Sequence, residues 1–300
     1  MILADIGSVL ASTARLGTPL ILAALGGLFS ERAGIVALGL EGMMLGGAFA
    51  AGTVAALTGS AWFGLAAALA AGIGLALLHG LVSIAERGEQ VVSGMALNIL
   101  AAGLCPALGV AWFGHGGDTP PLDRAERFLP VAFGLSGLVF ATALLVPLAS
   151  WVLRDSTFGL RLRAAGENPQ AVDAAGLSVA RLRYQALVLT GALTGLAGAY
   201  IAIADGAGFS RDMTAGRGYL ALAALIFGRW RPVPTVGACL LFAFADALQL
   251  RLQGSALPLI GQVPVELVQV LPYLLTLVAL AGVGGAARAP AALGRPFRRE

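Results

Sequence analysis

The sequence predicts an all-α protein, a polytopic transmembrane helix bundle in which residues 1–300 form a single transmembrane domain. Of the 300 residues, 58% are hydrophobic and only 12% are charged, and the mean hydropathy is +0.86. Apolar runs of roughly 20 residues recur along the chain, and this is the length that crosses a bilayer core as a helix. Arginines gather in a few loops, as the positive-inside rule describes for cytoplasmic segments.

In chain order, the apolar runs long enough to be spans cover residues 8–29, 34–57, 62–84, 91–110, 131–153, 184–204 and 267–285. The first contains Arg15, which has to snorkel or face protein, and the last contains Pro272, which membrane helices tolerate. Residues 236–251 form a shorter candidate. The total is about eight or nine crossings, and the broken segments set that range.

Residues 219–227 are apolar but too short to cross a bilayer alone. The run stops at Gly228-Arg229-Trp230-Arg231-Pro232. We therefore expect a broken or re-entrant segment that is buried among other helices. We expect Arg229 and Arg231 to set the orientation and to contact lipid headgroups where this segment reaches the cytoplasm.

A polar segment at 154–183 interrupts the apolar runs. Within it, Asn168 is placed to cap a helix, Pro169 suits the first helical position, and Gly176 can adopt the left-handed conformation that ends one. A short helix is therefore predicted at 169–175. The flanking arginines, which mark the loop as cytoplasmic, are Arg154, Arg161, Arg163, Arg181 and Arg183. A capped helix on that face is a docking element.

The same rule places the tail at 286–300 in the cytoplasm, because it carries four further arginines: Arg288, Arg295, Arg298 and Arg299. Counting crossings outward from the cytoplasmic loop puts the loop at 115–127, and the N-terminus, outside. The excess of positive charge is interpreted as membrane orientation and lipid contact, with no nucleic acid as a partner.

Several chemistries are excluded by the residues themselves. All 19 residues of the Lys+Arg count are arginines, so the chain has no lysine for a P-loop or a Schiff base. The two histidines, His79 and His115, fall on opposite sides of the predicted membrane, and Cys105 and Cys239 lie in apolar runs. We therefore expect neither a metal site nor a disulfide, no cofactor and no catalytic residue.

Three segments carry a resemblance to a known family: LFSERAGIVALGLEGMM at 28–44, VVSGMALN at 91–98 and RAAGENP at 163–169. They resemble permease subunits of ATP-binding-cassette importers, in the branch that handles simple sugars, nucleosides and branched-chain amino acids. The first segment is most similar to the nucleoside-type permeases. It departs from them at Ala37, where that subgroup usually has asparagine.

The resemblance implies that the helix at 169–175 is a coupling helix, which sits in a cleft of a separate ATP-binding-cassette ATPase subunit. The residues that this implies for coupling are Arg163, Gly166, Glu167, Asn168, Pro169, Val172 and Gly176. It also implies a second permease subunit, identical or different, and an extracytoplasmic solute-binding protein that delivers solute to the loops at 115–127 and 205–218.

Two acidic residues lie inside predicted spans, Glu41 and Asp246. An ionised carboxylate facing lipid is costly, so each should face a cavity or a partner. Glu41 would either line a pathway or cap a helix that begins at Gly42. Asp246, with Gln249 one turn later, would either accept hydrogen bonds from solute hydroxyl groups or pair with Arg251.

Ser93 and Asn98 bring a hydroxyl and an amide to the start of the run at 91–110, where they would bridge helices or contact a polar solute. Phe242, Phe244 and Tyr219 would stack on a nucleobase or pack against lipid and protein. The candidate substrate pathway therefore consists of Glu41, Ser93, Asn98, Phe242, Asp246 and Gln249.

Together these features predict a transport subunit, not an enzyme, in a bacterial cytoplasmic membrane. A separate subunit would hydrolyse ATP. The expected solute is a nucleoside, with a simple sugar second and a branched-chain amino acid third. The alternative is an ion-coupled secondary transporter in which Glu41 and Asp246 serve protons or sodium. Such a transporter would need neither a capped cytoplasmic helix nor an ATPase.

Overall fold

The computed structural model describes residues 2–114, 117–252, 256–257, 261–262 and 288–297. In chain order the elements are α1 (Ile2–Arg32), α2 (Leu40–Thr58), α3 (Ala61–Gly80), a π-helical turn (Leu81–Ala85), α4 (Gln90–Phe113), a 3-10 turn (Arg124–Glu126), β1 (Pro130–Ala132), β2 (Leu135–Ser136), α5 (Gly137–Asp155), α6 (Thr157–Glu167), α7 (Pro169–Ala174), α8 (Val179–Ala199), a second π-helical turn (Tyr200–Asp205), α9 (Arg217–Phe227), α10 (Pro232–Leu252), β3 (Ala256–Leu257) and β4 (Gly261–Gln262).

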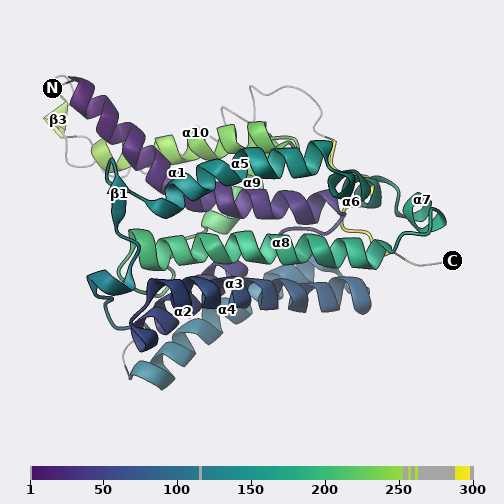
Figure 1. Ribbon diagram of the computed structural model, residues 1–300, viewed down its shortest axis with the longest axis horizontal. Coiled ribbons are helices and arrows are strands. Elements are labelled where there is room, and N and C mark those ends of the chain that lie inside the picture. Colours follow the sequence, from purple (N-terminus) through teal and green to yellow (C-terminus); the bar gives the residue numbers. More distant parts are fainter. Residues whose placement is uncertain (1, 115–116, 253–255, 258–260, 263–287, 298–300) are drawn as a thin grey trace.

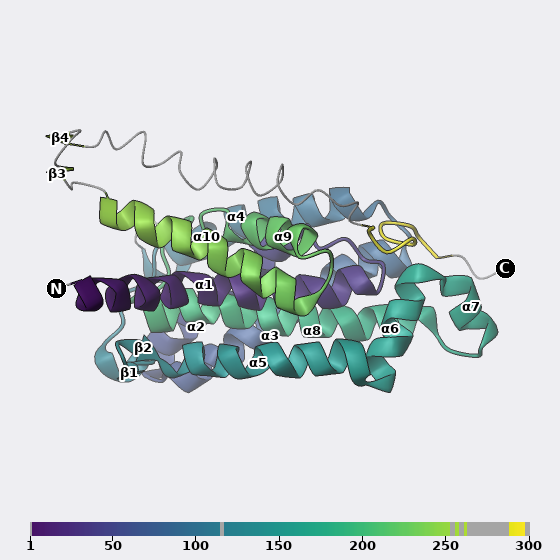
Figure 2. The ribbon, with the colours of Figure 1, turned by 90° about the horizontal axis from the view of Figure 1, so that it is seen from above.

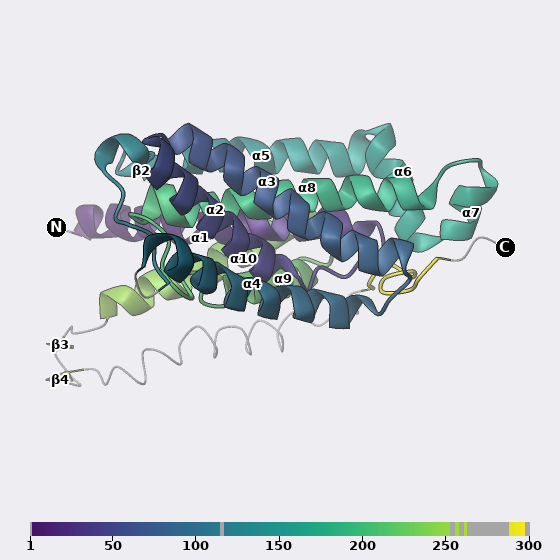
Figure 3. The same ribbon diagram turned by 90° about the horizontal axis from the view of Figure 1, so that it is seen from below.

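The long helices run along one common direction (Figure 1). One end of the bundle, here called the α7 end, carries α6, α7 and the C-terminus. The other, the β1 end, carries the N-terminus and the β1–β2 hairpin. Figures 2 and 3 show α4 and α5 at opposite edges, with the short α9 beside α10. The chain is thus an all-helical polytopic bundle.

Within the described residues, seven helical segments are long and apolar enough to cross a membrane. They include the runs predicted at 8–29, 62–84, 91–110 and 184–204. The short candidate at 236–251 extends to the 21 residues of α10. The predicted short segment at 219–227 is confirmed as α9, which has 11 residues. The predicted span at 267–285 lies outside the described residues.

Two predicted spans begin later than the apolar pattern suggested. The run at 34–57 becomes helical only at Leu40, because the chain turns at Gly34, whose φ is +90°. The run at 131–153 starts with a hairpin, and α5 begins at Gly137. The hairpin turns through Phe133 and Gly134, which both have positive φ, the conformation of a tight two-residue turn. Hydropathy alone does not reveal either turn.

Glycines bring α3 and α8 together. A Cβ atom added to Gly72 would overlap the carbonyl oxygen of Gly191, and one added to Gly195 would overlap that of Ala68. Side chains of any size would separate these backbones. Such small residues let helices approach closely where the hydrophobic effect gives little driving force for association.

This packing predicts a position-dependent effect within α3. Gly72→Ala should destabilise the protein by about 1–3 kcal/mol, because the new methyl group meets backbone atoms of α8 that cannot move aside easily. Gly74→Ala is the matched control, since a Cβ there meets nothing within 4 Å. Thermal unfolding of the purified protein should show a lower midpoint for Gly72→Ala only. Equal midpoints for the two variants would contradict this account of the α3–α8 contact.

Candidate functional site

The chain is non-helical between α1 and α2, and side chains from two helices pair with its backbone. Oε1 of Glu31, near the end of α1, accepts a hydrogen bond from the N–H of Ala37 at 3.1 Å. Oε1 of Gln90, at the start of α4, accepts one from the N–H of Val36 at 2.9 Å. Glu31 and Gln90 are both buried. Unpaired backbone groups in an apolar bundle are costly, so these side chains stabilise the break.

Asn98 holds the start of α2 from a neighbouring helix. Its Oδ1 accepts from the N–H of Gly42 at 2.8 Å, and its Nδ2 donates to the carbonyl oxygen of Leu38 at 2.9 Å. The residue before α2 is Gly39, which has no side chain to act as a cap. Nδ2 of Asn98 also donates to the hydroxyl oxygen of Tyr219 at 2.9 Å. Asn98 therefore caps α2 and bridges α2, α4 and α9.

Glu41 caps a helix, but the helix is α9 and not its own. Its carboxylate accepts from the hydroxyl of Thr214 at 2.6 Å and from the N–H groups of Gly216 and Gly218 at 2.9 and 2.6 Å. An anion at a helix N-terminus also meets the positive end of the helix dipole. Gly218 permits this approach, since a Cβ there would overlap the backbone of Glu41. The side chain of Glu41 remains half-buried.

Glu41, Asn98 and Tyr219 thus form one polar set at the start of two broken helices. The starts of α2 and α9 converge on it, so N–H groups and a carboxylate lie together inside an apolar bundle. Tyr219 is 46% exposed, although its hydroxyl is bound to Asn98. Part of its side chain is therefore uncovered beside hydrogen-bonding groups. Discontinuous helices of this kind typically form solute sites in transporters.

Three other candidate positions face neighbouring helices. The hydroxyl of Ser93 lies 2.9 Å from Nδ1 of the buried His79, so it links α4 to α3. Phe242 is buried and meets Phe227 edge to face, with ring centroids 5.8 Å apart. Ala37 is likewise buried, and its N–H is held by Glu31. These contacts correspond to the packing interpretation of Ser93 and Phe242.

Asp246 lies on α10, away from the three-residue polar set. Because α10 begins at Pro232, Asp246 is about 21 Å along the helix, toward the β1 end. It is half-buried and within electrostatic range of Arg217, the first residue of α9. Gln249 follows three residues later on α10. Arg251, the partner considered from sequence, donates a hydrogen bond to the hydroxyl of Ser8.

At the β1 end, two loops predicted to face outside are joined by backbone hydrogen bonds. The N–H of Phe128 donates to the carbonyl oxygen of Ile203 at 2.8 Å, and that of Leu122 to Ala207 at 2.9 Å. The hydroxyl oxygen of Thr119 accepts a hydrogen bond from the backbone N–H of Phe209 at 2.8 Å. The two loops therefore form one paired surface layer.

At the α7 end, the predicted short helix is confirmed as α7. Oδ1 of Asn168 accepts from the N–H of Ala171 at 3.1 Å, Pro169 takes the first helical position, and Gly176 has a φ of +79°. Val172 is buried against residues of α6 and α8. The preceding segment, 157–167, forms a helix of its own, α6, which is absent from the predicted elements.

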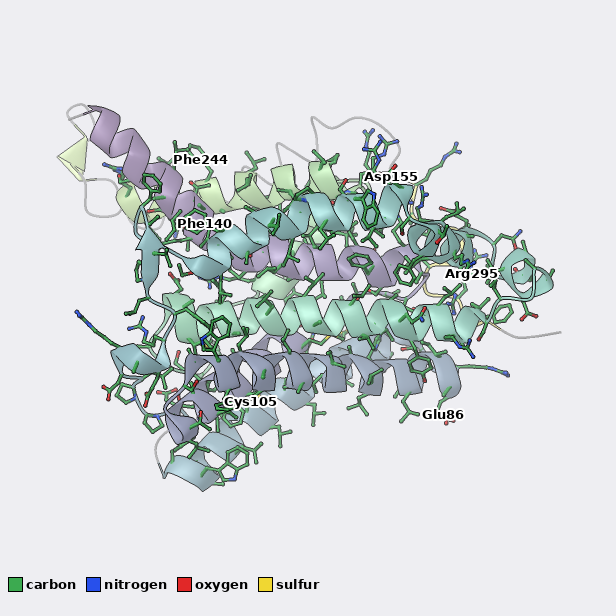
Figure 4. The ribbon with its side chains drawn as sticks, in the orientation of Figure 1. Glu86, Cys105, Phe140, Asp155, Phe244 and Arg295 are labelled. Carbon is green, nitrogen blue, oxygen red and sulfur yellow. The ribbon has the colours of Figure 1, made fainter. Side chains whose placement is uncertain are left out.

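The C-terminal segment is built into the same region. The N–H of Ala292 donates to the carbonyl oxygen of Gly166 at 2.8 Å, and that of Ala291 to Oε2 of Glu167 at 3.3 Å. Arg183, only 1% exposed, donates to the carbonyl oxygens of Ala33 and Arg295 at 3.1 and 3.3 Å. Figure 4 places Arg295 at this end, beside α6. The tail thus ties α6 to the ends of α1 and α8.

The sequence did not predict the roles of Glu31, Gln90, Thr214 and Arg183, and it gave Arg183 only as a marker of the cytoplasmic loop. The role of Glu31 could have been suspected from sequence. It is an acidic residue next to a predicted span, and it belongs to the segment at 28–44 that carries the family resemblance. The roles of Gln90, Thr214 and Arg183 depend on partners far away in sequence. No local pattern points to them.

Comparison with known proteins gives a consistent family. Residues 9–280 match the family described as branched-chain amino acid transport system, permease component. The guanosine ABC transporter permease protein NupQ of Bacillus subtilis is 38% identical over 303 residues, covering 93% of this chain and 92% of the relative. The nucleoside ABC transporter permease protein NupC of Lactococcus lactis is 36% identical over 298 residues, covering 92% of each.

A solved structure of an inward-facing ABC transporter, described as metal-chelate type, is similar in fold. Its TM-score is 0.52 at 16% sequence identity, and the match covers 91% of this chain and 86% of that one. Within the described residues of the present chain, no group of three or more His, Cys, Asp or Glu side chains could hold a metal ion. At 16% identity, the likeness concerns the helix arrangement alone.

The cap on α9 predicts a specific role for the charge of Glu41. Glu41→Gln keeps the shape, but its amide can accept at one oxygen only and turns an NH2 group toward N–H donors. We expect a loss of about 1–3 kcal/mol, seen as a lower thermal unfolding midpoint. Glu86→Gln, an exposed position at the α7 end (Figure 4), is the control and should leave the midpoint unchanged. A midpoint for Glu41→Gln equal to that of the control would contradict the capping role.

Proposed function

The chain belongs to the family of branched-chain amino acid transport system permease components, and we propose that the solute it carries is a nucleoside. It is the permease subunit of an ATP-binding-cassette importer, a non-catalytic, multi-pass protein of the bacterial cell membrane. This membership argues against an ion-coupled secondary transporter. The observation that supports this solute is the sequence similarity, over more than 90% of the chain, to a guanosine permease and a nucleoside permease.

The polar set supports the same solute class. A nucleoside combines a flat base with a hydroxyl-bearing ribose. Tyr219 offers a partly exposed aromatic side chain for the base, while the carboxylate of Glu41 and the amide of Asn98 are hydrogen-bonding groups beside it. A simple sugar or a branched-chain amino acid would use the polar groups but has no flat base to stack on the ring. Asp246 and Gln249 would contact solute nearer the outer surface.

The architecture of the importer follows from the two ends of the bundle. We place the α7 end in the cytoplasm, with α7 seated on the ATPase subunit, and the paired loops at 117–128 and 203–213 outside, facing a solute-binding protein. A second permease would complete the path. The seven described spans and the predicted span at 267–285 make eight, and α9 returns the chain to the α7 end before α10, which adds a ninth, broken crossing. Closure of the ATPases would shift the bundle between inward and outward states.

The coupling role of α7 is tested by its cap. Asn168→Ala removes the hydrogen bond to Ala171 and should cost about 1 kcal/mol locally, enough to fray so short a helix. We expect insertion to be normal, but co-purification of the ATPase subunit and solute-stimulated ATP hydrolysis to fall. Ser178→Ala removes the equivalent cap of the long, packed α8 and should leave both measurements near wild type. Normal coupling in Asn168→Ala would refute the docking role.

The solute site is tested at Tyr219. Tyr219→Ala removes the exposed ring and should raise the half-saturation of guanosine uptake roughly 10- to 100-fold, the usual range for loss of a base-stacking partner. Tyr219→Phe keeps the ring and should change the half-saturation of guanosine uptake little. Phe140→Ala, on α5 and 43% exposed, is the control for loss of an exposed aromatic residue (Figure 4). Unlabelled uridine, but neither glucose nor leucine, should compete. Competition by glucose or leucine alone would overturn the nucleoside assignment.

A further inference from the structure

A basic cavity lies at the α7 end, between the ends of α1 and α5, the helix α6 and the turn from α9 to α10. Its volume is about 590 Å³. Four of the residues that line it are arginines: Arg32, Arg154, Arg163 and Arg231. No acidic residue is among the described residues that line it. Four guanidinium groups that line one cavity indicate a specific anion site more strongly than a loop with a general excess of arginine does.

The arginines come from four different elements, and two of them are held in place by backbone carbonyl groups. Nε of Arg32 donates to the carbonyl oxygen of Trp230 at 2.8 Å. Arg163 donates to the carbonyl oxygens of Gly159 and Arg154 at 3.4 and 3.2 Å. Each guanidinium has five N–H donors, so these bonds orient Arg32 and Arg163 and leave donors for a further partner.

Like charges meet in this cavity, and one carboxylate, that of Glu167, acts on Arg32 more strongly than either neighbouring arginine does. Arg32 experiences the positive charges of Arg163 and Arg231 and one opposing carboxylate, that of Glu167. Glu167 also accepts the backbone N–H of Ala291, so its charge is shared with the tail. A bound anion would relieve the repulsion among the four arginines, since oppositely charged groups at short range attract strongly where solvent is partly excluded.

The surroundings of the cavity match the surface level of a membrane. Leu153, Pro232 and Val233 contribute its apolar lining. On α5, which lines the cavity through Ser150, Leu153 and Arg154, Leu148 and Trp151 are 49% and 58% exposed. Tryptophan is enriched at the boundary between lipid and water. A ligand with an anionic head and an apolar tail would place the head among the arginines and the tail along α5.

We propose that this cavity binds the phosphodiester group of an anionic phospholipid from the cytoplasmic leaflet. Arginine matches a phosphate geometrically, because its planar fork can donate two parallel hydrogen bonds. Basic pockets between membrane helices on the cytoplasmic side typically bind such headgroups. The proposal rests on the proposed orientation of the chain, and it is independent of the solute. A bound lipid would brace α6, and with it α7, against the ends of α1 and α5.

The test compares two double variants of the full-length chain that lose the same charge. Arg154→Gln with Arg231→Gln removes two arginines of the cavity whose side chains make no hydrogen bond within the described protein. Arg161→Gln with Arg181→Gln removes two exposed arginines of the same polar region that do not line it. Phosphatidylglycerol and phosphatidylcholine are titrated into each detergent-solubilised protein, and bound lipid is counted by native mass spectrometry.

We expect the wild type and the Arg161/Arg181 control to prefer phosphatidylglycerol. The cavity variant should bind it roughly 30-fold more weakly, as expected for two membrane-surface arginines. Thermal unfolding in each lipid should follow the same order. Equal lipid binding by the two double variants would overturn the proposal.

A second experiment distinguishes binding of a lipid phosphodiester from binding of soluble phosphate. Inorganic phosphate added without lipid should neither raise the unfolding midpoint nor displace phosphatidylglycerol. If it does both, the cavity is a site for soluble phosphate, and the lipid assignment is overturned. If the cavity variant keeps its lipid preference but loses the ATPase subunit, the cavity is a protein interface, which also overturns the proposal. None of these readouts requires solute transport, so failure of the nucleoside assignment would remain distinguishable.

Discussion

Two helices of this chain begin inside an apolar bundle, and the need to pair their first backbone groups is the constraint on which the rest of the structure depends. An unpaired N–H or C=O group in hydrocarbon costs several kcal/mol. Asn98 supplies partners for the start of α2, and Glu41 supplies them for the start of α9. Because both side chains come from other helices, α2, α4 and α9 are held together. The placement of Tyr219 beside Asn98 follows from this arrangement.

Near the α7 end, Glu31 likewise accepts hydrogen bonds from two separate segments of the chain. One of its carboxylate oxygens accepts the N–H of Ala37 in the break, and the other accepts the indole N–H of Trp230 in the turn from α9 to α10. Arg229 and Trp230 both have positive φ, which costs about 1–2 kcal/mol for a residue other than glycine. The bonded indole helps to hold that turn. Through Glu31, the end of α1 connects the break before α2 with the turn after α9.

The segment to which we assign coupling, α6 and α7, adjoins the same element. A Cβ on Gly166 of α6 would overlap the carbonyl oxygen of Arg32, the last residue of α1, so the two backbones are in direct contact. The tail adds hydrogen bonds from Ala292 to Gly166 and from Gly294 to Gly34. A displacement of α6 would therefore act on the residues that hold the broken helices, with no flexible linker between them. This gives the proposed coupling a physical route from the loop to the polar set.

The sequence by itself determined the class of protein, the approximate position of most helices, the short α9 and the capped α7, because these depend on composition, apolar run length and neighbouring residues. Tertiary structure alone decided where apolar runs are not helical, as at 34–39 and 131–136. It also decided which helix Glu41 caps, that Phe242 is packed, and that the tail joins α6. The physical reason is that a buried backbone group is satisfied by whichever side chain the fold brings near. Asn98 and Tyr219 are 121 residues apart, so no local pattern could predict their hydrogen bond.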